Sequence, residues 1–256
     1  MKITVLGCGT SSGVPALGCD CAVCRSDDPR NNRRRVSIMV ENQDTRLIVD
    51  TSPDLRAQLL DANVSHIDGV LYSHAHADHV HGIDDLRSIN FNMRREIDVW
   101  GNGPTMDIIQ ERFGYAFHAM TGGNVWNRPS LTAHSFQHGE TFHIGSVPVT
   151  PFDQVHGRSL SSGFRFGDAA YSTDVKEFPD HSFETLKGIK LWIIDCVGFH
   201  EHPTHAHLDL ALEWISQIKP ERAVLTHMSH HFDYEDLCEL LPEGVEPGYD
   251  GLVLEL

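Results

Sequence analysis

The sequence predicts an α/β protein in which two β-sheets pack face to face and helices cover their outer faces, a four-layer αββα sandwich. Apolar, β-branched segments typical of strands alternate with helical patterns along the chain, and pairs of segments suited to hairpins occur in both halves. The 256 residues, 40% of them hydrophobic, suffice for one large core. Because no internal repeat or Pro/Gly/Ser-rich linker is visible, we expect a single domain over residues 1–256.

Strands and short helices alternate in the first half of the predicted fold. Leu55, Leu59 and Leu60 recur at helical spacing after Ser52, a plausible N-cap, so a helix is expected over 53–63. The elements expected in this half are strands at 2–6, 36–41, 46–50, 68–73 and 97–100, and helices at 53–63, 83–89 and 104–113.

The second half begins after a region, 114–130, whose pattern predicts no regular element. Beyond it, short apolar segments bounded by turn residues indicate strands, and two longer segments have helical spacing. The elements expected here are strands at 131–136, 147–150, 163–166, 169–172, 190–195, 222–226 and 252–256, and helices at 208–218 and 234–240.

One stretch, His74-Ala-His-Ala-Asp-His79, carries the strongest functional signal in the chain. It follows the apolar strand expected at 68–73, and the ends of rigid strands are common places for functional sites. His74 and His76 can approach one metal ion, while Asp78 and His79 come round the following turn and can reach a second. Without a metal, imidazoles crowded in this way would be poorly paired. We therefore expect a metal site here.

Three further candidate ligands follow segments with strand character. His156 lies just past a strand-like segment, Asp174 follows the strand expected at 169–172, and His227 follows the strand expected at 222–226. In a face-to-face sandwich these strand ends can deliver their side chains to the edge that carries the histidine cluster. A carboxylate such as Asp174 can bridge two cations. The pattern therefore predicts that all three join the metal site.

A separate group of ligands is formed by Cys19, Cys21 and Cys24, three thiols within six residues. A structural zinc takes four tetrahedral ligands, so a fourth must come from elsewhere in the chain. His230, three residues beyond His227, is the best candidate. The alternatives are three reduced thiols without a metal, or a redox pair formed by Cys21 and Cys24.

The charge distribution bears on possible partners. A formal charge of −16 gives no broad basic surface of the kind that tracks nucleic acid backbones. Positive charge is concentrated at Arg33-Arg34-Arg35, which forms either a solvated basic turn or an edge that faces a phosphate. The glycine-rich stretch 7–15 has no lysine and no helical pattern after it, so it does not fit a P-loop.

Targeting signals are not evident in the sequence. The apolar run at the N-terminus is too short for a signal peptide, and no segment approaches the roughly 18 apolar residues of a membrane span. These observations predict a cytoplasmic protein without membrane attachment.

The ligand pattern resembles the metallo-β-lactamase superfamily of binuclear hydrolases, whose H-x-H-x-D-H motif matches residues 74–79, followed in order by His, Asp and His. The resemblance implies the αββα fold of that superfamily and two catalytic divalent metals, zinc or manganese, with iron also compatible. It implies that one metal is held by His74, His76 and His156, the other by Asp78, His79 and His227, and that Asp174 bridges them.

The thiol triad narrows the resemblance to one branch. Together with Gly-Thr-Ser-Ser-Gly-Val-Pro and Leu-Thr-His-Met-Ser-His-His-Phe-Asp, it is similar to the branch containing the cyclic-phosphate phosphodiesterase of the carbon–phosphorus lyase pathway. That branch carries a catalytic histidine in an Asn-His-x-Asp-Leu motif. Here the matching stretch is Ala206-His-Leu-Asp-Leu210, with an additional His205, and His207 is favoured over His205 as the residue that faces substrate.

The resemblance implies a phosphodiesterase that hydrolyses small phosphodiesters, such as cyclic nucleotides or cyclic ribose phosphates, with a metal-activated hydroxide. His207, as proton donor, and Asp78 are the expected catalytic residues, and His205 and His207 the expected substrate contacts. Long nucleic acids and membranes are not expected partners, and a homodimer is plausible from the family.

Three alternatives stay open at this point: a lactone or thioester hydrolase, a transfer-RNA 3′-end nuclease, and a non-hydrolytic protein of the pyrroloquinoline quinone protein B type. The nuclease needs an extended basic arm, which is not visible in this chain, and the intact set of seven ligands favours a hydrolase over the non-hydrolytic type.

Overall fold

A computed structural model describes residues 1–118 and 127–256, and it forms two seven-stranded sheets. The strands are β1 (Lys2–Gly7), β2 (Ser37–Asn42), β3 (Thr45–Val49), β4 (Gly69–Leu71), β5 (Ile97–Asn102), β6 (Leu131–Phe136), β7 (Phe142–Ile144), β8 (Val147–His156), β9 (Ser159–Phe166), β10 (Ala169–Ser172), β11 (Leu191–Asp195), β12 (Arg222–Thr226), β13 (Val245–Pro247) and β14 (Val253–Glu255).

The helices are short, and most follow a strand. They are α1 (Leu55–Asp61), α2 (Ala77–Val80), α3 (Leu86–Met93), α4 (Gly103–Arg112), α5 (Asp180–Leu186), α6 (Leu208–Ile218) and α7 (Tyr234–Leu240), with 3-10 turns η1 (Val23–Arg25), η2 (Pro29–Asn31), η3 (Ile83–Asp85) and η4 (Gly114–Ala116). Among the helices of residues 1–118 and 127–256, none has the length and apolar character needed to cross a membrane.

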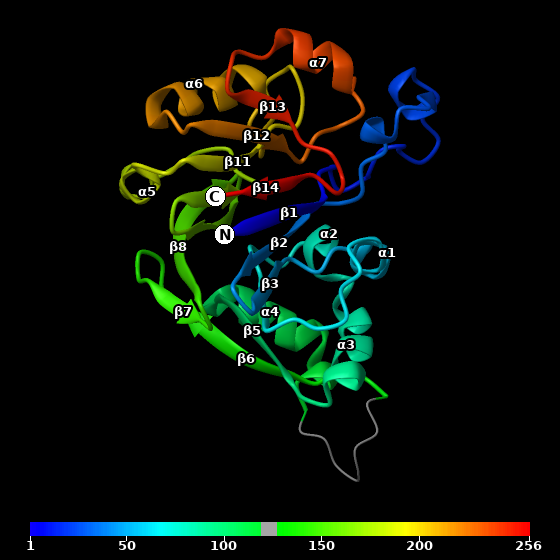
Figure 1. Ribbon diagram of the computed structural model, residues 1–256, viewed down its shortest axis with the longest axis vertical. Coiled ribbons are helices and arrows are strands. Elements are labelled where there is room, and N and C mark those ends of the chain that lie inside the picture. The colour runs from blue at the N-terminus through cyan, green and yellow to red at the C-terminus, as the bar shows by residue number, and fades with distance from the viewer. Residues whose placement is uncertain (119–126) are drawn as a thin grey trace.

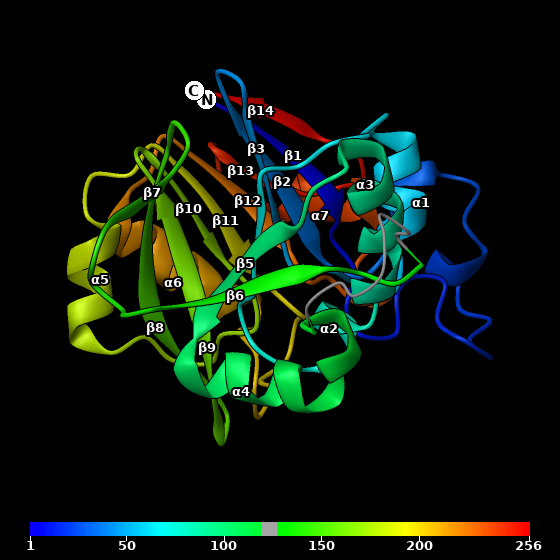
Figure 2. The ribbon, with the colours of Figure 1, turned by 90° about the horizontal axis from the view of Figure 1, so that it is seen from below.

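The two sheets pack against each other and carry helices on their outer sides. One sheet has the strand order β14-β1-β2-β3-β4-β5-β6, and the other the order β13-β12-β11-β10-β9-β8-β7. Figure 1 shows the two sheets, and Figure 2 shows α5 and α6 outside the second sheet and α1 and α3 outside the first. The predicted αββα layering is therefore confirmed, whereas the single domain over 1–256 stays a prediction.

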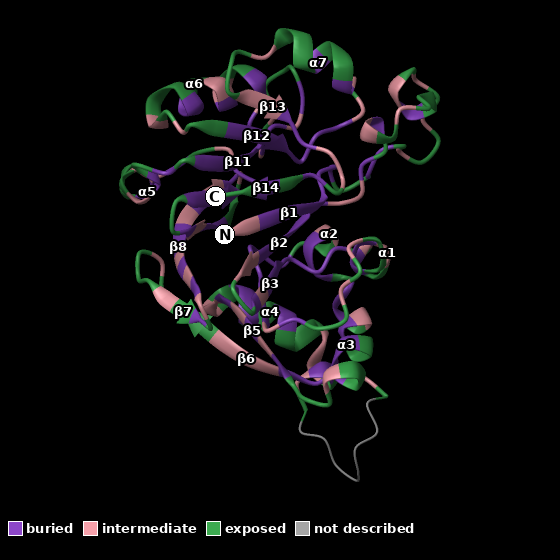
Figure 3. Cartoon of the chain, in the orientation of Figure 1, coloured by how far each residue is buried: buried purple, intermediate pink, exposed green. Residues whose placement is uncertain are grey.

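Alternate residues of the central strands enter two different cores, which is what period-2 side-chain geometry requires of a sheet covered on both faces. On β2, Ile38 and Val40 join the core between the sheets, while Met39 packs beneath the helices. On β3, Leu47 and Ile48 divide in the same way. Figure 3 shows the buried residues concentrated along these strands.

Several elements differ from the sequence prediction. The strands β7 and β13 have only three residues each, too few to show a period, and were not predicted, and neither was α5. The helix expected at 83–89 is a 3-10 turn followed by α3 at Leu86–Met93. The pattern-free region 114–130 contains η4, and residues 119–126 of it lie outside the described part of the chain.

The hairpin β8–β9 is longer than expected, running from Val147 to His156 and back from Ser159 to Phe166. As a consequence, His156 is the last residue of a strand, whereas the sequence placed it in a loop just beyond one. Because His156 pairs with Ser159 in the β8–β9 ladder, the backbone of His156 is fixed.

The basic cluster Arg33-Arg34-Arg35 is not solvated throughout, because its first residue is buried. Arg33 is 1% exposed, and its guanidinium donates to the backbone oxygens of Ser229 and Phe232 and to Oδ1 of Asn31. These bonds tie the N-terminal segment to the loop that follows β12. Arg34 instead pairs with Asp61 at the surface.

We expect Arg33→Met to lower the free energy of unfolding by about 3 kcal/mol or more, because three buried oxygens would lose their donor. Arg34→Met is the matched control and should cost less than about 1 kcal/mol, since its ion pair is solvated. Urea denaturation of the metal-loaded protein measures both changes. Equal midpoints for the two variants would contradict this role of Arg33.

Candidate metal centre

The predicted ligands reach one edge of the sandwich from four strand ends. His74 and His76 lie in the loop after β4, and Asp78 and His79 are part of the single-turn helix α2, for which His76 is the N-cap. His156 ends β8, and Asp174 and His227 follow β10 and β12. The structure therefore brings together all seven residues named from the sequence, in two groups: His74, His76, His156 and Asp174, and Asp78, His79, Asp174 and His227.

Backbone conformation at the strand ends directs these side chains. Asp50, Asp174 and His227 each follow a strand within two residues, and all three have positive φ angles of 64°, 54° and 56°. Non-glycine residues adopt this left-handed conformation at a cost, and they do so most often at functional sites. Here the turn places three polar side chains at the same edge.

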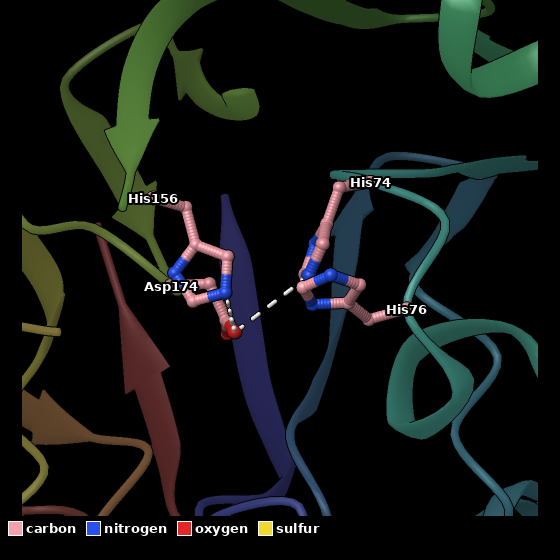
Figure 4. Close-up of side chains that lie close together, drawn as sticks. All are labelled: His74, His76, His156 and Asp174. Carbon is pink, nitrogen blue, oxygen red and sulfur yellow. Dashed lines mark ion pairs between the residues drawn. The ribbon is translucent and has the colours of Figure 1, made fainter. Parts of the chain in front are cut away.

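The carboxylate of Asp174 lies between two pairs of histidines. Its Oδ1 is 3.1 Å from Nε2 of His79 and 3.4 Å from Nε2 of His227. Its Oδ2 is 3.5 Å from Nε2 of His156 and 3.7 Å from Nε2 of His74. Figure 4 shows the second pair converging on this oxygen, with His76 beside His74. Each oxygen thus faces its own pair, as a carboxylate that bridges two metals would.

In three of these histidines the ring nitrogen that faces away from Asp174 has a hydrogen-bond partner. Nδ1 of His79 is 2.7 Å from Oδ2 of Asp50, and Nδ1 of His156 is 2.8 Å from the backbone oxygen of Thr204. Nδ1 of His74 is 3.0 Å from the hydroxyl of Ser73. Such bonds set the orientation of an imidazole and leave Nε2 as the nitrogen available to a metal.

Burial and charge act against each other at this centre. Burial raises the pKa of Asp174, but His227 and His79 outweigh it and hold that pKa well below its usual range. Burial lowers the pKa of His227, yet the carboxylate of Asp174, with help from Asp78, raises it to about 9. For His74, burial and the neighbouring His79 both lower the pKa. The carboxylates are therefore ionised, as metal ligands must be.

The residues present fit a pair of metal ions. Nε2 of His74, His79 and His227 are buried atoms without a hydrogen-bond partner in the described part of the chain. Buried polar atoms are normally paired, so three unpaired ones aimed at the same carboxylate need an explanation. Imidazole and carboxylate donors suit zinc, manganese and iron, which agrees with a binuclear metal site.

The structure revises the choice between the two histidines near α6. His205 is 9% exposed and lies against the cluster, with its Nε2 3.9 Å from Oδ2 of Asp174 and its ring stacked on that of His227 at 4.5 Å. His207 is instead the N-cap of α6 and lines a separate cleft with Lys176 and Trp214. The geometry therefore favours His205 over His207, because the chain turns into α6 at His207; which histidine faces a substrate stays a prediction.

The three thiols also lie together. The sulfur atoms of Cys19, Cys21 and Cys24 are within 4.8 Å of one another. Sγ of Cys21 is 3.9 Å from the backbone oxygen of His230, and Nδ1 of His230 is buried without a hydrogen-bond partner among the described residues. The thiol triad can therefore hold a structural metal, and His230 as its fourth ligand stays a prediction.

Two functional positions were missed in the sequence. Asp50 supports His79 and also accepts hydrogen bonds from the backbone and hydroxyl of Ser73. Asp195 accepts from the backbone of Val175, and its Oδ2 is 2.9 Å from Nδ1 of His205. Both acids close an apolar strand, the same signal that pointed to Asp174, so the sequence pattern contained the information needed to find them.

Asp50→Asn should lower metal affinity by about 10- to 100-fold, because His79 would lose the carboxylate that orients its ring. Competition with a metallochromic chelator measures the affinity, and Asp44→Asn on the exposed β2–β3 turn is the control. Equal affinities for the two variants would show that Asp50 does not support the site.

Cys21→Ser should remove one metal ion per chain and leave the other two in place, because the thiol triad is separate from the histidine groups. Metal content after gel filtration, measured by mass spectrometry, counts the ions, and the melting temperature should fall with the lost one. An unchanged metal count and melting temperature would exclude a metal at the thiols.

Comparisons with known proteins agree with this geometry. A family model described as "Beta-lactamase superfamily domain" matches residues 45–228. A crystal structure described as a new diphosphatase from the PhnP family has a TM-score of 0.92 to this chain at 35% identity, covering 100% of this chain and 97% of that one. This chain therefore belongs to the metallo-β-lactamase superfamily and, within it, to the family of that diphosphatase.

Two named proteins are also similar in sequence. A Porphyromonas gingivalis protein named octanoyltransferase is 36% identical over 255 residues, which are 98% of this chain and 51% of that protein. Coenzyme PQQ synthesis protein B of Rhodopseudomonas palustris is 31% identical over 208 residues, 76% of this chain and 62% of that protein. The chain thus spans about half to three fifths of the length of these relatives.

Proposed function

We propose that this protein is a metal-dependent phosphodiesterase that hydrolyses small phosphodiesters, with cyclic nucleotides and cyclic ribose phosphates as the first substrates to test. The observation that carries the proposal is the position of Asp174, whose two oxygens face two separate histidine pairs. Membership of a family with a diphosphatase supports chemistry at phosphorus. The acidic chain favours a small substrate over a long nucleic acid.

Two divalent metals, when bound, would activate a water molecule and offset the charge of the phosphoryl oxygens. The chain's own residues determine where they act. His74, His76 and His156 would hold one ion, and Asp78, His79 and His227 the other, with Asp174 shared between them. This arrangement requires that the phosphoryl group enters beside the exposed His76, the most accessible ligand of the first group.

His205 is the proposed proton donor for the leaving oxygen. Its Nδ1 is held by Asp195, so Nε2 faces the cluster and is available to a substrate. A carboxylate behind an imidazole also fixes the orientation of the ring, which a general acid needs. Asp195 approaches His227 as well, at 3.6 Å, and so links the acid to the metal ligands.

The same residues distinguish the proposed phosphodiesterase from the alternative functions. A lactone or thioester hydrolase would share the two groups of metal ligands but not the thiol triad. A role like that of the PQQ synthesis relative is the second candidate, because its sequence similarity covers 76% of this chain. The complete set of seven ligands supports hydrolysis. The activity in the name of the octanoyltransferase relative is not transferred, since this chain matches only half of that protein.

Side-by-side assays of the metal-loaded protein test the proposal. Bis(p-nitrophenyl) phosphate, 2′,3′-cyclic AMP and a lactone are offered at equal concentrations, with metal content measured on the same sample. We expect hydrolysis of both phosphodiesters and little of the lactone. Hydrolysis of the lactone alone, or of none of the three with a full metal complement, would contradict a phosphodiesterase.

His205→Ala should lower kcat for 2′,3′-cyclic AMP by about 10²- to 10⁴-fold while metal content stays at the wild-type value. The loss should be smaller for bis(p-nitrophenyl) phosphate, because p-nitrophenolate leaves readily without a proton. His207→Ala is the neighbouring control and should change kcat little. Equal losses on both substrates, or a larger effect of His207→Ala, would remove His205 from the role of acid.

A further inference from the structure

A cleft of about 400 Å³ opens directly beside the metal centre. It is lined by Ser11, Ser12, Ala16, Leu17, Arg35, Pro53, Ala77 and Asp78. Asp78 and Ala77 belong to the metal-binding loop, so the cleft shares a wall with the proposed catalytic site. Ser11 and Ser12 of the lining belong to the glycine-rich loop, which does not fit a P-loop, and the function proposed above leaves this loop without a role.

Arg35 lines this cleft and is held by Asp54. Its backbone N–H donates to Oδ2 of Asp54 at 2.9 Å, and its Nε is 3.0 Å from the same oxygen. Within residues 1–118 and 127–256, no group accepts a hydrogen bond from its Nη1 or Nη2. The two terminal amino groups are therefore positioned by one carboxylate and remain available to a ligand.

The glycine-rich loop lies against these amino groups. Gly13 has a φ of 65°, and a β-carbon at this position would lie 3.6 Å from Nη1 of Arg35. Ser11 is exposed, and its hydroxyl has no hydrogen-bond partner in the described chain, whereas the Ser12 hydroxyl is 3.0 Å from that of Thr10. Arg35 and Ser11 thus line the same cleft.

The charge of the cleft selects an anion. Arg35 and Asp78 are the charged residues among those that line it. Asp78 is the proposed ligand of a divalent ion, which would neutralise its carboxylate, and Asp54 pairs with Nε of Arg35, so Nη1 and Nη2 are the donors left to an anion. A planar guanidinium suits oxygens of one phosphoryl group, and a substrate with a single phosphoryl group on the metals would leave Nη1 and Nη2 of Arg35 without an acceptor.

We propose that Arg35, with the Ser11 hydroxyl, binds the second phosphoryl group of substrates that contain a diphosphate, such as dinucleoside diphosphates. This inference rests on the proposed function and narrows its substrate class. In such a substrate the two phosphorus atoms share one bridging oxygen, so a phosphoryl group at the metals places its neighbour in the adjacent cleft. The fully exposed Leu17 and Pro53 offer apolar contacts to the attached nucleoside.

The reaction balances with water as the only co-reactant. Water forms a bond to the phosphorus at the metal centre, and the bond from that phosphorus to the bridging oxygen breaks. The leaving nucleotide keeps the bridging oxygen, and the proton of the water is released. P1,P2-di(adenosine-5′) diphosphate would yield two molecules of AMP in this way.

The test compares kcat/KM for P1,P2-di(adenosine-5′) diphosphate with kcat/KM for bis(p-nitrophenyl) phosphate, which has one phosphoryl group. Arg35→Gln should lower the ratio of the two values by about tenfold or more, mainly through KM for the dinucleotide. Arg34→Gln is the matched control, because this neighbouring arginine pairs with Asp61 outside the cleft, and it should keep the ratio within twofold.

Ser11→Asp provides a second variant with little risk to folding, because Ser11 is exposed and makes no hydrogen bond in the described chain. A carboxylate at this position should repel the second phosphoryl group and lower the same ratio. Unchanged ratios in Ser11→Asp and in a folded Arg35→Gln would overturn the subsite while leaving the phosphodiesterase intact. A wild-type protein that cleaves neither substrate would overturn both proposals.

Discussion

The buried carboxylate of Asp174 is the constraint on which the rest of the centre depends. It is 2% exposed, and an ionised group at such a depth costs several kcal/mol unless it is paired. Four imidazole nitrogens at 3.1 to 3.7 Å surround it, two on each oxygen. The ends of β4, β8 and β12 deliver these imidazoles, and the end of β10 delivers Asp174 itself.

Residues around the metal centre hold its imidazoles in place. Asp50 fixes His79, and Asp195 fixes His205 while also approaching His227. Behind them, Arg33 and the thiol triad hold the loop after β12 that carries His227 and His230. The N-terminal segment therefore contributes twice, by securing this loop and by forming one wall of the cleft that contains Arg35.

Much of this arrangement can be predicted from the sequence, because it follows from short-range patterns of apolar and polar residues. The apolar strands, α6 at Leu208–Ile218 and the seven ligand residues follow from periodicity and from polar residues after strands. The three-residue strands β7 and β13, unlike β4 and β14, are not part of a longer apolar segment and could not be found. The choice of His205 over His207 depends on how one extended segment crosses the centre, and the burial of Arg33 depends on contacts nearly 200 residues away in the chain, from Arg33 to Ser229.

The most direct test is a crystal structure of the metal-loaded protein with anomalous data collected at the absorption edges of zinc and manganese. The account predicts two peaks about 3.5 to 4 Å apart, one on each side of the Asp174 carboxylate. One of them should lie among His74, His76 and His156, and the other among Asp78, His79 and His227. A single peak at Asp174, or two peaks of which only one contacts its carboxylate, would contradict a bridging carboxylate.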